Sequence, residues 1–174
     1  MKKRIIKPFV LGAISAYGIV ALFLVSSARL GVLPVQADVT PSRIETTLLG
    51  SALHAAVSRH APNGGNPMPA SKENLLAGEK LYRQMCSRCH GLSKDSVSSY
   101  GLSFYPPAPQ LALHRTPYTE SEMYWIVKHG IRNTGMPAWG NLLSDKEIWQ
   151  AVTYVRSLDS VPDSNIPELL DSWR

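Results

Sequence analysis

The stretch QMCSRCHG, residues 84–91, contains both cysteines of the chain, Cys86 and Cys89, and His90 follows the second one directly. A structural disulfide would be strained at this spacing and would leave His90 without a role. A thioredoxin-like redox pair requires a βαβ context, which the sequence lacks. Zinc would require a second pair of ligands at short spacing, and none follows.

The remaining interpretation is the C-x-x-C-H pattern of covalent c-type haem attachment. The spacing lets the two sulfurs reach the two vinyl groups of one porphyrin, while the adjacent imidazole reaches the iron. Because the motif occurs once, the sequence predicts a single haem c. It would be bound covalently through Cys86 and Cys89, with His90 as an iron ligand.

Four segments downstream of residue 40 carry the signals of helices. Each has a Ser or Thr at its first or second residue that can cap the first turn, and in three of them a Glu follows this residue three positions later, as in a capping box. The predicted helices cover residues 42–60, 71–85, 118–130 and 144–158. Residues 91–118 and 131–143 lack sustained periodicity and contain prolines, which indicates loops. Since no alternating strand pattern is present, the predicted fold class is all-α with long loops.

Residues 72–158 resemble the class I cytochrome c family, with the matching pieces in that family's order. Gly78 and Tyr82 in AGEKLY are similar to the small and aromatic residues of its first helix. Tyr154 in VTYVRSL is similar to the aromatic of its last helix, which crosses the first. CSRCH, PQL (109–111) and GMP (135–137) resemble the attachment site, the Pro-x-Leu and the loop of the second iron ligand. The resemblance implies a cytochrome c-like haem domain.

Met136 is the predicted second ligand of the iron. It lies 46 residues after His90, and Gly135 and Pro137 flank it in a loop. A chain of that length can wrap the macrocycle and return on its far side, and the flanking residues let a stiff loop approach the porphyrin. The alternative role for such a methionine is to fill a gap in the core. The other candidate ligands are Met68, Met85, Met123, His54, His60, His114 and His129.

The resemblance also implies a residue that orients His90. In the family, the carbonyl of a loop proline accepts the ring N–H of this histidine and increases its basicity. Pro109 occupies that position, and Ala108 is an alternative because further prolines precede it. Trp125 and Trp139 are expected to wall the haem pocket, with a simple core role as the alternative.

The formal net charge of +5 originates in the N-terminus. Five of the 18 basic residues and none of the 13 acidic residues lie within residues 1–29, so the remaining 13 basic side chains balance the 13 acidic ones. A nucleic-acid-binding function therefore loses its main support.

The N-terminus reads as a membrane signal. Residues 8–28 carry no charge and, as a helix, would span about 31 Å, close to the ~30 Å hydrocarbon core of a bilayer. A basic cluster precedes them, which predicts a single-pass inner-membrane anchor with the rest of the chain on the periplasmic side. A cleavable signal peptide, with VQA at 35–37 before the cut, is the alternative.

The predicted organisation has four parts. Residues 1–30 form the anchor or signal peptide, and residues 31–70 a connector with the helix at 42–60 and a Pro/Gly linker at 61–70. Residues 71–160 form the haem domain, and residues 161–174 a tail that can add a turn of helix. The linker is expected to let the haem domain move.

Ligation by His and Met fills both axial positions of the iron, which leaves one-electron exchange as the chemistry. The sequence thus predicts a membrane-tethered electron carrier, not an enzyme, between respiratory or photosynthetic redox proteins such as a donor complex and a terminal oxidase or reaction centre. The alternatives are a fixed subunit of a quinol-oxidising or dehydrogenase complex and, with a labile Met136, a haem gas sensor or peroxidase-like enzyme. No small-molecule substrate is expected. Basic residues that could steer an acidic partner are Arg83, Arg88, Lys94, Lys128 and Arg132.

Overall fold

The computed structural model describes residues 2–37, 39–93 and 95–158. The predicted tail at 161–174 and Lys94 lie outside these residues. Two compact units divide the chain, the first ending at Val39 and the second beginning at Thr40. Within the described residues there is no β-strand, and only an isolated bridge joins Ser93 to Ser96. The predicted all-α class is confirmed.

The first unit contains helix α1, Lys2–Arg29. The segment Val10–Arg29 is long and apolar enough to cross a membrane, a property that signal sequences share. The structure thus contains one candidate span within the described residues, at the place where the sequence predicts an anchor or a signal peptide.

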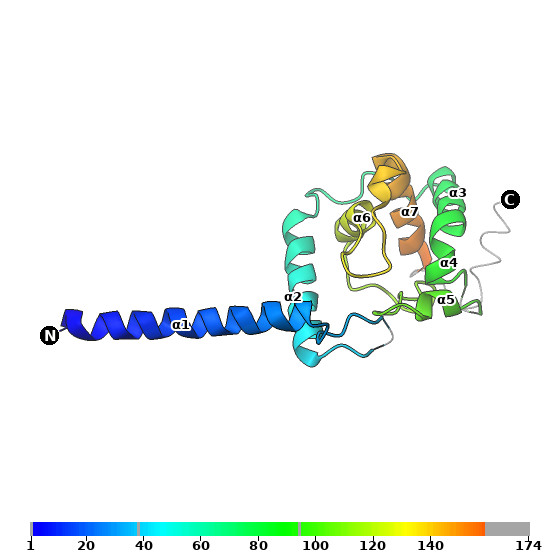
Figure 1. The fold of residues 1–174 in the computed structure, drawn as a ribbon. Coiled ribbons are helices and arrows are strands. Elements are labelled where there is room, and N and C mark those ends of the chain that lie inside the picture. The colour runs from blue at the N-terminus through cyan, green and yellow to red at the C-terminus, as the bar shows by residue number, and fades with distance from the viewer. Residues whose placement is uncertain (1, 38, 94, 159–174) are drawn as a thin grey trace. The chain divides into compact units, whose positions relative to one another are not determined.

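The second unit is built on two helices that cross closely, the first helical segment of the haem domain and the last (Figure 1). The first comprises α3 (Lys72–Leu81), a π-helical turn, η1 (Tyr82–Cys86), and α4 (Ser87–His90), which follow one another directly. The last is α7, Asp145–Leu158. The helix predicted at 71–85 therefore continues to His90, so that CSRCH forms its final turn.

The crossing depends on Gly78. A Cβ atom at this position would overlap the backbone carbonyl oxygen of Gln150 and lie 2.8 Å from the Cβ of Tyr154. One turn further along, the rings of Tyr82 and Tyr154 pack with their centroids 5.3 Å apart, and both side chains are buried. The absent side chain of Gly78 thus lets the two helices approach at backbone distance.

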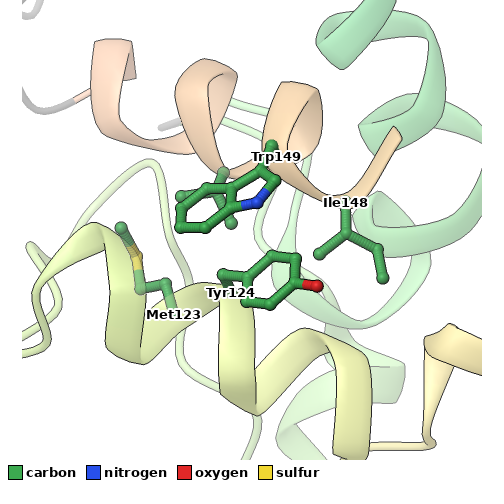
Figure 2. Packing of buried hydrophobic residues seen from close by; sticks show 5 residues of the cluster. Met123, Tyr124, Ile148 and Trp149 are labelled. Carbon is green, nitrogen blue, oxygen red and sulfur yellow. The ribbon is translucent and has the colours of Figure 1, made fainter. Parts of the chain in front are cut away.

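Helix α6, Glu120–His129, packs against α7 and completes the core. The rings of Tyr124 and Trp149 stack at 4.2 Å with an interplanar angle of 11°, and Met123 and Ile148 lie beside them (Figure 2). Both helices begin with the predicted capping boxes. Their Ser or Thr hydroxyl accepts a backbone N–H, and their Glu accepts hydrogen bonds in return.

Helix α2, Arg43–His60, lies against α6 (Figure 1). Val57 is fully buried in this contact region, and the Ser58 hydroxyl donates to the Glu122 carboxylate at 3.1 Å. The rings of His54 and Tyr118 lie 5.4 Å apart. The predicted extra helix is therefore packed onto the haem domain.

The linker predicted at 61–70 is also held by the haem domain. The Asn66 amide donates to the Thr153 hydroxyl at 2.8 Å, and Met68 packs against the core cluster of α6 and α7. Asn66 and Met68 thus tie to the haem domain a segment whose Pro and Gly content resembles that of a flexible tether. Two short helices in the predicted loops, α5 (Ser99–Leu102) and the 3-10 turn η2 (Trp139–Asn141), were not predicted.

Substituting Gly78 should test the crossing. In Gly78→Ala, the added methyl group must push α3 away from α7, which should lower the free energy of unfolding by about 1–3 kcal/mol or more. Denaturant unfolding of the haem-loaded protein, followed by circular dichroism, would measure this.

Gly50→Ala is the matched control, because a Cβ at Gly50 in α2 meets nothing within 4 Å. It should leave stability unchanged or raise it by up to about 1 kcal/mol through helix propensity. Equal stability of Gly78→Ala and the unsubstituted protein would contradict a backbone-distance crossing.

Candidate haem site

A mostly apolar cavity of about 280 Å³ lies between the CSRCH turn, the loop of residues 104–118, α6, the loop around Met136 and α7. All five predicted site residues line it, and they come from three separate segments of the chain. These residues are Cys86, Cys89, His90, Pro109 and Met136.

The His90 ring is held by one hydrogen bond, between its Nδ1 and the Pro109 carbonyl oxygen at 2.8 Å. A carbonyl can only accept, so Nδ1 carries the proton and Nε2 keeps a free lone pair. Burial lowers the pKa of His90, and the bond to Pro109 opposes this shift in part. A neutral imidazole with Nε2 unprotonated is the form that binds a metal ion. The Ala108 carbonyl instead accepts from the Gln110 amide at 3.0 Å.

Cys86 and Cys89 are free thiols, each half-buried. Burial, and secondarily the neighbouring Cys89, raise the pKa of Cys86 to about 12. Cys86 is therefore a neutral thiol at ordinary pH. No group of three or more His, Cys, Asp or Glu side chains within the described residues is arranged to hold a metal ion.

Tyr82 fixes the end of the CSRCH turn. Its hydroxyl donates to the Gly91 carbonyl at 2.7 Å and lies 3.3 Å from the His90 carbonyl. Burial, with smaller contributions from Cys86 and Tyr154, raises the pKa of Tyr82 well above its usual value, so the hydroxyl remains a donor. The turn is thus tied to the helix crossing through a buried hydrogen bond.

Gln110 is a site residue that the sequence analysis missed. Its side chain is 5% exposed. Its Nε2 donates to the Cys89 carbonyl at 3.1 Å as well as to Ala108, and its Oε1 accepts the Ser98 N–H at 2.8 Å. One amide therefore joins the CSRCH turn, the 96–98 loop and the Pro109 loop. The PQL motif alone gave no signal for this, because a polar residue in a loop is usually exposed.

The Met136 loop is closed by its own hydrogen bonds. The Ile131 N–H donates to the Met136 carbonyl at 3.1 Å, and the Thr134 hydroxyl donates to the Ile131 carbonyl at 2.8 Å while accepting the Met136 N–H at 3.1 Å. A Cβ at Gly135 would lie 3.0 Å from the Phe104 ring. Glycine here lets the loop lie flat on an aromatic ring at the cavity wall.

The other candidate ligands divide into two groups. Met85, Met123 and His114 line the cavity, whereas the remaining candidates are absent from its lining. Trp139 also lines it. Trp125 does not, and its ring packs instead against His60 and His129. The expectation that Trp125 walls the pocket was wrong, because α2 covers the side of α6 that carries it.

The basic residues expected to steer a partner are mostly engaged within the chain. Arg83 pairs with Glu79, and Lys128 with Asp145, each at 2.7 Å. The Arg88 guanidinium lies 4.8 Å from the centre of the Tyr100 ring. Arg132 is exposed.

Gln110→Leu should destabilise the protein, because it leaves the Ser98 N–H and two carbonyls without their partner. A buried polar group without a hydrogen bond costs about 1–3 kcal/mol, so we expect a loss of at least about 2 kcal/mol in the free energy of unfolding. Gln84→Leu, at an exposed position of the same residue type, should change it by less than about 0.5 kcal/mol. Equal effects of the two substitutions in denaturant titrations would argue against the bridging role of Gln110.

Parts of the chain are similar to known proteins. Residues 73–155 match the family described as cytochrome c oxidase, cbb3-type, subunit III. Over 91 residues, 52% of the chain, the sequence is 31% identical to the quinohemoprotein alcohol dehydrogenase ADH IIB of Pseudomonas putida, of which it covers 12%. A chain of the Kuenenia stuttgartiensis reducing HAO-like protein complex is similar with a TM-score of 0.40 and 23% identity, covering 53% of this chain and 46% of that one.

The matched segment contains most of both crossing helices, the CSRCH turn and the loop of Met136. Cytochrome c domains carry haem iron and exchange electrons through it, and the apolar cavity with its neutral imidazole fits such a group. The family predicted from the sequence is thereby confirmed. Residues 73–155 match a class I-like c-type cytochrome domain, the kind of domain that exchanges electrons through a haem.

Proposed function

We propose that the chain is a membrane-anchored one-electron transfer protein with one covalently bound haem c. The observation that carries the proposal is the convergence of two thiols, a neutral imidazole and a thioether on one apolar cavity. When bound, the haem supplies an iron that cycles between the ferric and ferrous states. Cys86 and Cys89 would attach it, and His90 and Met136 would hold its iron.

The side chains suit these roles chemically. Each thiol can add across a vinyl group and supply both the sulfur and the hydrogen of the new thioether, so attachment needs no oxidant. The Pro109 carbonyl holds the proton on Nδ1 of His90, which orients the ring and increases its basicity. The sulfur of Met136 favours ferrous iron and raises the reduction potential relative to a second nitrogen ligand.

The location of the protein follows from α1 in this proposal. If α1 is retained, the basic residues before the span keep the N-terminus in the cytoplasm and the haem domain on the outer face of the inner membrane. The partners would be redox proteins that deliver and accept single electrons there.

A specific observation favours the alternative of a subunit fixed within a larger complex. Helix α2 and residues 66 and 68 pack on the haem domain. The segment that can act as a tether is therefore the one before α2, in place of the predicted linker at 61–70. The quinohemoprotein alcohol dehydrogenase relative suggests a dehydrogenase as one kind of partner. Co-purification of the native chain with a second redox protein would support this alternative.

Optical spectra of the purified full chain test the proposed function. We expect a low-spin haem in both oxidation states, no response to carbon monoxide, and the weak far-red band of a bond between sulfur and ferric iron. The haem should stay with the polypeptide after extraction with acidified acetone. A high-spin haem that binds carbon monoxide readily would overturn the electron-transfer assignment in favour of a sensor or a peroxidase-like enzyme.

Met136→Ala should open one axial position. The far-red band should disappear, carbon monoxide binding should rise from none to nearly complete, and the reduction potential should fall. Met123→Leu is the matched control, since Met123 also lines the cavity but lies within the α6–α7 core. If Met123→Leu removes the band and Met136→Ala keeps it, the ligand assignment is wrong.

A further inference from the structure

Helix α2 has an engaged C-terminal part and an exposed N-terminal part. Ser58 in the C-terminal part donates to Glu122 of α6, and Val57 beside it is fully buried. In the N-terminal part, at about 100° per residue, Leu48 lies roughly opposite Val57, Ile44 lies about 40° from Leu48, and Leu49 lies about 100° from Leu48 on the other side. The exposed fractions of Ile44, Leu48 and Leu49 are 79%, 63% and 48%.

The exposed apolar residues are confined to the first two turns of α2. Beyond them, within residues 50–60, no large apolar side chain is exposed. Burying Leu and Ile side chains is favourable, so three exposed side chains of this kind within two helical turns indicate a surface that covers them. We call Ile44, Leu48 and Leu49 the α2 patch.

The position of the α2 patch along the chain identifies what covers it. The candidate span ends at Arg29 and α2 begins at Arg43. The residues between them, 30–42, can extend over roughly 43–47 Å at most, at ~3.3–3.6 Å each. Asp38 is their single charged residue, and their exposed large apolar residues are Leu30, Val32, Leu33, Val35 and Val39.

The chemistry of the α2 patch also fits lipid. Its three side chains are aliphatic, and none of them offers a polar atom for a specific contact. Arg43, exposed and next to Ile44, can reach lipid phosphates while its stem lies along apolar surface. Side chains of this kind bury their apolar area at the boundary between headgroups and acyl chains.

We propose that the α2 patch inserts into the outer leaflet of the membrane in which α1 is anchored, so that α2 holds the haem domain at the bilayer surface. The inference rests on the proposed membrane anchoring. It restricts the redox partner to a protein whose electron-exchanging group lies near the membrane surface, since α2 is packed on the haem domain and carries it along.

Spin labelling of the full, haem-loaded chain in phosphatidylcholine–phosphatidylglycerol vesicles tests this proposal. The cysteines of CSRCH are consumed in the haem attachment, so Leu48→Cys provides a single labelling site. Its nitroxide should collide with oxygen as a lipid-embedded label does, and its collision rate with a water-soluble nickel chelate should be at least about fivefold lower than that of the control. Lys80→Cys, exposed on α3, is the matched control and should show water-like accessibility to both reagents.

The outcomes separate this inference from the proposed function. A chain that leaves the membrane on washing with alkaline carbonate overturns both the anchoring and the α2 contact. A chain that stays in the membrane but carries a water-accessible Leu48→Cys label overturns the α2 contact alone. Protection of that label from both oxygen and nickel also overturns the α2 contact with lipid, because a label buried in a protein contact is shielded from both reagents. Additional spin–spin broadening would then identify a second copy of this chain as the partner that covers the α2 patch.

Discussion

The backbone contact between α3 and α7 at Gly78 is the constraint on which the haem site depends. It brings Tyr82 onto Tyr154, where both rings are buried, and the Tyr82 hydroxyl then holds the carbonyl of Gly91, just after the attachment turn. The position of His90 is therefore set by a helix crossing that begins more than three turns earlier in the chain. A methyl group added at Gly78 would displace the crossing, and the His90 imidazole would then move together with the helix that carries it.

The polar contacts around the CSRCH turn are made to backbone groups of the turn and its neighbouring loops, and the cavity lining remains mostly apolar. Gln110 binds the Cys89 and Ala108 carbonyls and the Ser98 N–H, and Pro109 binds the His90 ring. These bonds satisfy loop groups that would otherwise lie buried without partners. A low-dielectric cavity would disfavour the charged form of a bound haem, so the same arrangement that holds the loops would also influence the reduction potential of that haem.

The parts of the structure that depend on local chemistry could be predicted from the sequence. The caps at Thr119 and Ser144 and the CSRCH motif each act within a few residues. What escaped prediction depends on contacts over long separations: the Asn66 amide bonds Thr153, 87 residues away, and Gln110 bonds Cys89, 21 residues away. The prediction that Trp125 walls the haem pocket was wrong for the same reason, because its neighbour His60 belongs to a helix outside the family pattern.

The packing of α2 on the haem domain limits how the haem domain can orient toward a redox partner. A linker of free Pro, Gly and Asn residues would let the haem domain sample many orientations, and encounter with a partner would then depend on diffusion and charge. With Ser58 bonded to Glu122 and Asn66 bonded to Thr153, α2 and the haem domain turn as one body. Arg83 and Lys128 are also engaged in ion pairs within the chain, which weakens long-range steering. If α1 anchors the chain as proposed, orientation has to come from α2 and the segment that joins it to α1, and a short segment favours a partner fixed in the same membrane over one that diffuses freely.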